Sequence, residues 1–101
     1  MKYEVDKQQD KTIFKLVNDT LGHEVAADLK TELIFLQKEI DNQFIIDLGD
    51  VTKCDSSGIS CLFLFERMEK EKGKKLILRN VNDSVMEIIN IARLERVFDF
   101  E

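Results

Sequence analysis

A chain of 101 residues is close to the commonest size of a single folded domain. Hydrophobic residues make up 44% of it and charged residues 35%, a balance typical of soluble globular proteins and not of disordered ones. Fifteen basic and twenty acidic residues give a net charge of −5, which disfavours general binding to nucleic acid or to anionic lipid.

The targeting signals and the cysteine content also limit the class of protein. No stretch approaches the roughly 18 apolar residues that a membrane span needs, and the N-terminal sequence MKYEVDKQQDK is too polar for a signal peptide. The two cysteines, Cys54 and Cys61, cannot form a disulfide framework or a metal quartet. We therefore expect a single domain over residues 1–101 in the cytoplasm, with no metal or cofactor and with neither nucleic acid nor membrane as a partner.

The first half of the chain predicts a hairpin, a helix and a buried strand. Apolar and polar residues alternate around a polar tetrad at 8–11, which indicates a β-hairpin in the first seventeen residues. Residues 18–22 then form a loop rich in helix-capping residues. A helix is expected from about His23 to Asp41, because four apolar residues recur at helical spacing: Leu29, Leu33, Leu36 and Ile40. The apolar run at 44–48 is typical of a strand buried on both faces.

The second half continues this alternation. A loop over residues 49–55 leads into a helix that ends near Lys72, with Gly73 at the position after its end. Residues 76–78 predict a second buried strand, and Asp83 or Ser84 is expected to cap a third helix. Residues 97–100 are expected to end the chain as a short edge strand or as an apolar clasp. The fold class is therefore α/β, a mixed sheet of four or five strands with a parallel centre and three or four helices.

Groups for catalysis are scarce in this sequence. His23 is the only histidine, and its position before the first predicted helix favours a capping or exposed role over a catalytic one. The four glycines do not form a phosphate-binding loop of the P-loop or Rossmann kind. We therefore predict no catalytic residue and no enzymatic activity.

The junction at Asp55, Ser56 and Ser57 has two interpretations. All three residue types favour the N-cap of a helix, so the segment is explained by capping alone. Alternatively, a hydroxyl in the first turn is open to phosphorylation. A phosphate there would meet free backbone N–H groups and the positive end of the helix dipole, so it would change the surface charge without unfolding the helix.

Five segments carry a resemblance to a known family: FIIDL (44–48), VTKCDSSG (51–58), KLILRNV (75–81), VMEIINIARL (85–94) and VFDFE (97–101). In this order they resemble the STAS domain, the fold of bacterial anti-sigma factor antagonists and of the cytoplasmic tails of sulphate transporters. The DSSG sequence followed by an aliphatic residue is the most specific of these motifs. The element order matches over essentially the whole chain, and the motifs match over the last sixty residues.

The resemblance implies a phosphorylation switch in the regulation of transcription. Ser57, the second serine of the pair, would be phosphorylated by an anti-sigma factor that is also a serine kinase, and a PP2C-type phosphatase would reset the switch. Unphosphorylated protein would bind the kinase, as a monomer or a weak dimer, through a surface that includes Asp55, Ser56 and Gly58. The alternative is a STAS scaffold, stressosome-like or associated with a transporter, that has no working phosphorylation switch.

Two segments depart from the family pattern. The loop before the first helix often carries an acidic residue in the family, and here Gly22 stands nearest to that register. The turn after the last helix, usually Ser-Gly-Leu, is Ala92-Arg93-Leu94. The first departure concerns the surface that would face the kinase.

The helix after Ser57 is apolar on almost every side over its first two turns. One stripe has the spacing of a sheet-facing side: Cys61, Leu64, Phe65 and Met68. Ile59, Leu62 and Phe63 then point the other way, which predicts a partner-binding surface with an exposed apolar anchor beside Ser57. The alternatives are that neighbouring helices bury these residues, or that the two stripes exchange roles.

Overall fold

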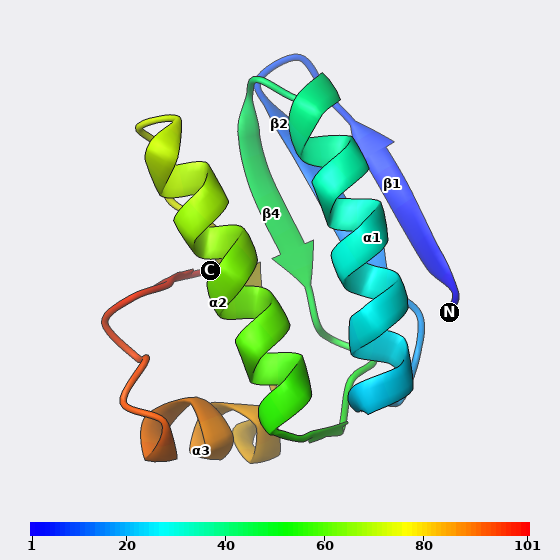
Figure 1. Cartoon of the computed structure of the whole chain (residues 1–101), viewed down its shortest axis with the longest axis vertical. Coiled ribbons are helices and arrows are strands. Elements are labelled where there is room, and N and C mark those ends of the chain that lie inside the picture. Colours follow the sequence, from blue (N-terminus) through cyan, green and yellow to red (C-terminus); the bar gives the residue numbers. More distant parts are fainter.

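Seven strands and three helices make up the protein, as seen in a computed structural model that describes all 101 residues (Figure 1). The strands are β1 (Tyr3–Lys7), β2 (Lys11–Leu16), β3 (Thr20–Leu21), β4 (Gln43–Asp47), β5 (Lys53–Cys54), β6 (Ile77–Arg79) and β7 (Asp99–Phe100). The helices are α1 (His23–Glu39), α2 (Ser56–Glu71) and α3 (Asp83–Ile91). None of the helices combines the length and the hydropathy that crossing a membrane requires.

The main sheet has five strands in the order β1-β2-β4-β6-β7. The hairpin pair β1 and β2 is antiparallel, and every other neighbouring pair is parallel. The β4 and β6 strands are hydrogen-bonded neighbours, with Ile45 opposite Ile77. The predicted mixed sheet with a parallel centre is therefore confirmed, as are the N-terminal hairpin and the short C-terminal strand.

Both long helices cover the same face of this sheet (Figure 1). On that face Phe14 of β2, Phe44 of β4 and Phe65 of α2 form a chain of aromatic contacts, with ring centroids 6.4 and 4.7 Å apart. The opposite face carries Ile45 in a row with its register neighbours Ile13 and Ile77. Ile45 is only 1% exposed, so β4 is buried on both faces as predicted.

The sheet-facing side of α2 differs from the predicted one. Leu62 is fully buried and Leu64 is 36% exposed, so the prediction that Leu64 faces the sheet and Leu62 faces away is wrong. The buried side instead carries residues spaced by three or four: Gly58, Leu62, Phe65 and Glu69. The helix ends as predicted, because Gly73 has a φ of +75° and adopts the left-handed conformation that glycine favours after a helix.

The buried side of α2 includes a carboxylate without a hydrogen-bond partner. Glu69 is 1% exposed, and neither of its side-chain oxygens has a partner. The nearby ammonium groups point elsewhere, since Lys72 Nζ donates to the carbonyls of Gln37 and Ile40 at the end of α1. Burial raises the pKa of Glu69, and the positive charges of Lys72 and Lys74 only partly oppose this rise.

We expect Glu69→Met to stabilise the protein by about 1–3 kcal/mol at pH 7, because it removes a buried polar group without a partner. The raised pKa means that the folded chain holds this proton to a higher pH than the unfolded chain does. The part of the cost that comes from ionising Glu69 is therefore absent below the unfolded pKa of about 4.3 and grows as the pH rises toward the folded value. Urea unfolding at pH 4 and pH 7 measures both effects.

The matched control is Glu71→Met, which removes an exposed carboxylate from the same helix. Its effect should stay within about 0.5 kcal/mol at both values of pH. A loss of stability in Glu69→Met at pH 7 would contradict this account of the buried carboxyl.

Candidate functional site

The loop between β4 and α2 is held on one side by the segment that precedes α1. The backbone N–H groups of Thr52 and Lys53 donate to the carbonyl of Asp19 at 2.8 and 3.1 Å, and β3 pairs with β5 in parallel. This two-stranded sheet was not expected, because residues 18–22 were predicted as a loop only. Two residues per strand are too few for an alternating pattern to be recognised in a sequence.

The other side of the loop is held by the start of α3. The Asn82 side chain donates to the carbonyl of Val51, and Ser84 Oγ donates to the carbonyl of Thr52 at 2.7 Å. The residue that precedes α3 is Asn82, so the prediction that Asp83 or Ser84 caps this helix is wrong. These side chains bind the neighbouring loop instead of their own helix, which sequence spacing does not reveal. The loop that leads to Ser57 is therefore fixed from two directions.

The first turn of α2 carries the DSSG segment. Asp55 is the N-cap, and its Oδ1 accepts a hydrogen bond from Gly58 N at 3.1 Å. Ser56 and Ser57 are the first two residues of the helix. Ser56 is exposed, whereas Ser57 is partly buried against α1. The predicted position of Ser57 in the first turn is confirmed, but the more exposed of the two hydroxyl groups belongs to Ser56.

Gly58 allows α2 to begin in close contact with β3 and β5. A Cβ atom at this position would lie 2.5 Å from the carbonyl oxygen of Leu21 and 2.8 Å from Cys54 Sγ. Both distances are below what real Cβ atoms show, and the first involves backbone that cannot move freely. Only glycine therefore fits at this contact.

We expect Gly58→Ala to lower the free energy of unfolding by about 1–3 kcal/mol, because the added methyl group overpacks the contact with Leu21. Ser60→Ala is the matched control, since it changes an exposed position in the next turn and should have an effect within about 0.5 kcal/mol. Chemical denaturation measures both. An unchanged stability in Gly58→Ala would show that the contact is looser than described.

Two hollows flank the start of α2. The first, of about 370 Å³, lies between α1 and α2 and is lined by Ser56 and Ser57; we call it the α1–α2 cleft. The second, of about 380 Å³, lies between α2 and α3 and is mainly apolar; we call it the α2–α3 groove. Ser56 lines both, whereas Ser57 lines only the α1–α2 cleft. The two neighbouring hydroxyl groups thus have different surroundings.

The α2–α3 groove accounts for part of the predicted partner-binding surface. Asp55, Ser56, Ile59 and Phe63 line it. Gly58, Leu62 and Ile59 are all buried, and Ile59 is only 4% exposed, so the prediction that these three offer exposed contact surface is wrong. Of the predicted apolar anchors, only Phe63 is partly exposed. The physical reason is the close approach at Gly58, which turns Leu62, one helical turn later, toward the core.

Sequence reasoning missed the α3 wall of this groove: Ile88, Ile91, Ala92 and Leu94. Ile91 is 70% exposed, the largest exposed fraction among the large hydrophobic residues. The sequence pattern could have indicated this exposure. Ile91 falls outside the helical stripe that α3 turns toward the core, so the core packing does not require an apolar side chain there.

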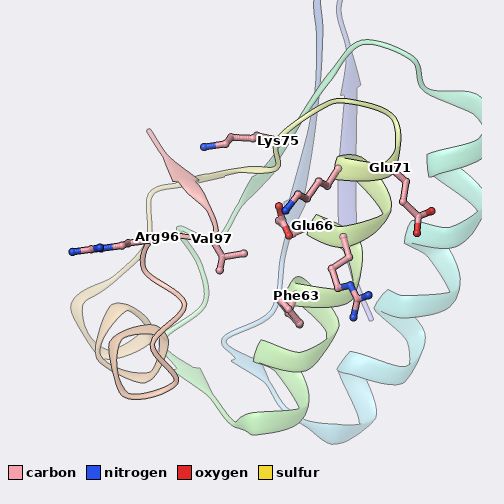
Figure 2. Close-up of a pocket in the computed structure, with 8 residues that line it drawn as sticks. Phe63, Glu66, Glu71, Lys75, Arg96 and Val97 are labelled. Atoms are coloured by element: carbon pink, nitrogen blue, oxygen red, sulfur yellow. The ribbon is translucent and has the colours of Figure 1, made fainter.

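The largest hollow, of about 720 Å³, lies toward the other end of α2. Phe63 and Glu66 point from α2 toward the C-terminal segment, and the side chains of Lys75 and Arg96 extend away from the helix (Figure 2). No residue of the DSSG segment lines this hollow, although Phe63 lines both it and the α2–α3 groove.

The cysteines near the site are poor nucleophiles. Burial raises the pKa of both Cys54 and Cys61 to about 11, so both are thiols at neutral pH. No group of three histidine, cysteine or acidic side chains lies close enough together to hold a metal ion. The site therefore presents two neighbouring serine hydroxyl groups, one of them beside an apolar groove.

The sequence matches the family model of the STAS domain over residues 2–101. Among solved structures, an anti-sigma factor antagonist (STAS) domain protein from Planctomyces limnophilus has a TM-score of 0.88 at 18% identity, covering 97% of this chain and 87% of that one. A sulfate transporter family protein from Wolinella succinogenes gives 0.73 at 25% identity, covering 92% and 78%.

The anti-sigma factor antagonist SpoIIAA is similar in two states. Its unphosphorylated form has a TM-score of 0.82 at 14% identity, covering 99% of this chain and 88% of that one. The phosphorylated form of Bacillus SpoIIAA gives 0.74 at 13% identity, covering 99% and 91%. At identities this low, these similarities establish a shared fold and nothing further.

Proposed function

Since the chain belongs to the STAS domain family, we propose that it is an anti-sigma factor antagonist that sequesters an anti-sigma serine kinase while Ser57 is unphosphorylated. Proteins with this fold are regulatory and interaction modules. The observation that carries the proposal is the first turn of α2, which follows a loop held from two directions. There Ser57 lines the α1–α2 cleft, and its neighbour Ser56 adjoins the apolar α2–α3 groove.

The covalent step is an ordinary phosphoryl transfer. The kinase moves the γ-phosphoryl group of ATP to Ser57 Oγ, which loses its proton, and ADP leaves. A PP2C-type phosphatase would reverse the change by hydrolysis, in which water restores the hydroxyl group and releases inorganic phosphate. SpoIIAA, which shares the fold, has been solved both without and with the phosphate, and this supports a fold that tolerates such a group.

The surroundings of α2 suggest how a phosphate would end binding. A partner that covers the α2–α3 groove would cover Ile91 and Phe63 and exclude water from the adjoining Ser56 and Asp55. A phosphate on Ser57 would add nearly two negative charges to the first turn of α2, two residues from the existing carboxylate of Asp55. Desolvating that charge against a partner is costly unless the partner supplies cations.

A second candidate is a STAS scaffold without a working switch, associated with a transporter or with other STAS proteins. The similarity to the Wolinella succinogenes sulfate transporter family protein favours keeping this candidate. It predicts stable complexes whose affinity does not depend on the state of Ser57. The two candidates are separated by the serine variants described next.

Incubation with the organism's anti-sigma kinases and ATP, followed by intact mass measurement, tests the switch. We expect one added phosphate in the parent protein and in Ser56→Ala, and none in Ser57→Ala. Ser57→Ala should still bind the kinase. Ser57→Asp should bind at least tenfold more weakly while its melting temperature changes little, because a helix N-terminus tolerates negative charge.

Two outcomes would count against this assignment. If Ser57→Ala were still phosphorylated, on Ser56, the switch residue would be the more exposed serine and not Ser57. Equal kinase affinity for Ser57→Asp and the parent protein would favour the scaffold candidate.

The α2–α3 groove provides a separate test of the contact surface. We expect Ile91→Asp to weaken kinase binding about tenfold or more, because it puts a charge into a contact that must lose water. Phe35→Asp is the matched control, since Phe35 is 62% exposed on α1 and lines neither hollow beside Ser57. Calorimetric titration with the kinase measures both, and equal losses of affinity would exclude the groove as the contact.

A further inference from the structure

The α1–α2 cleft joins Ser57 to two basic side chains. Its α1 wall carries His23 and Lys30, and its α2 wall carries three serines together with Cys61 and Leu64. No aspartate or glutamate lines it, although acidic residues outnumber basic ones in the whole chain. The local charge is therefore opposite in sign to the net charge of the protein.

Neither basic side chain of the cleft is engaged elsewhere. Lys30 and His23 form no ion pair and donate no side-chain hydrogen bond. Lys30 lies close to the wall formed by α2, since it also lines a smaller hollow with Cys61 and Leu64. Burial raises the pKa of Cys61 and the positive charge of Lys30 opposes that rise, which agrees with this placement.

The shape of the cleft leaves room beside Ser57. The α1 wall between His23 and Lys30 is formed by Ala26 and Ala27, whose side chains end at Cβ. Ser57 itself is partly buried because α1 lies beside it. A group added to Ser57 Oγ therefore has open space of about 370 Å³ on the α1 side of the helix.

We propose that the α1–α2 cleft receives the phosphate on Ser57, with the Lys30 ammonium and the His23 imidazole binding its oxygens. The inference rests on phosphorylation at Ser57, as proposed above, and adds the residues that hold the product. Charge-assisted hydrogen bonds to a phosphate are the strong ones, and Lys30 supplies a full charge to a group that carries nearly two. Asp55 at the N-cap of α2 and Glu24 in the first turn of α1 are acidic and oppose binding, but neither lines the cleft.

The placement distinguishes the two serines. A phosphate on Ser57 is joined to the α1 wall and so links α1 to α2. A phosphate on Ser56 is attached to the exposed residue between the cleft and the α2–α3 groove, next to Asp55. Lys30 should therefore affect the first phosphate more strongly than the second.

The test uses full-length protein with phosphoserine encoded at position 57, which requires no kinase. Phosphorus NMR between pH 4 and pH 8 gives the pKa of the phosphate, which is about 6 for an ordinary phosphoserine. We expect Lys30→Met to raise this pKa by about 0.5–1 unit, because a nearby positive charge favours the dianion. Lys38→Met removes the same charge from the exposed end of α1 and should leave it within about 0.2 unit.

Melting temperature supplies a second readout. Phosphoserine at position 57 should raise the melting temperature of the parent protein, and Lys30→Met should remove this increase. The melting temperature of the unphosphorylated protein should not change in Lys30→Met, since Lys30 is exposed and unpaired. With phosphoserine at 56, Lys30→Met should shift the phosphate pKa by less than half as much as with phosphoserine at 57. Lys30→Gln serves as a second variant should the methionine variant fold poorly.

Equal phosphate pKa values in Lys30→Met and Lys38→Met would overturn the proposal, as would a larger Lys30 effect at position 56 than at 57. These results are distinguishable from failure of the proposed function. The phosphorus NMR measurement uses encoded phosphoserine, so its result does not depend on whether a kinase modifies Ser57. The kinase assay likewise does not depend on whether Lys30 and His23 bind the phosphate.

Discussion

The arrangement of this protein depends on the contact between Gly58 and Leu21. Because a Cβ at position 58 would meet the Leu21 carbonyl at 2.5 Å, α2 can begin against β3 only with glycine there. That contact sets the rotation of α2 about its axis. Leu62 and Phe65 turn inward, the Ser57 side faces α1, and the Phe63 side faces the C-terminal part of the chain. One missing side chain thus decides which surface each residue of the DSSG segment occupies.

Sequence patterns were sufficient where periodicity alone determines the structure. The hairpin, the two buried strands at 44–48 and 76–78, and the helix end at Gly73 all follow from alternation, apolar runs and a single glycine. The rotation of α2 did not follow, because the five consecutive positions 61–65 are all apolar and two stripes satisfied the same spacing. A tertiary contact at Gly58 decided between them, and no local pattern records such a contact.

The candidate site was predicted in position but not in detail. Its place at the start of α2 follows from capping residues and the DSSG segment, which are local in sequence. The partial burial of Ser57, the loop contacts of Asn82 and the α3 wall around Ile91 all involve residues far apart in the chain. The burial of Glu69 is a similar case, since a charged residue on a helix is expected to face solvent, and only tertiary packing leaves it 1% exposed.

The two hollows beside α2 impose a condition on any switch at Ser57. A phosphate held by Lys30 and His23 would have part of its charge neutralised on the α1 side, so long-range repulsion of a partner would be weak. Discrimination would then have to be local. The partner would lose access to the cleft and to the Ser57 hydroxyl, while the apolar groove lined by Ile59 and Ile91 would stay unchanged. Such a switch would separate affinity, supplied by the groove, from regulation, supplied by the cleft. The first turn of α2 forms a wall of both surfaces, since Ser56 lines each of them.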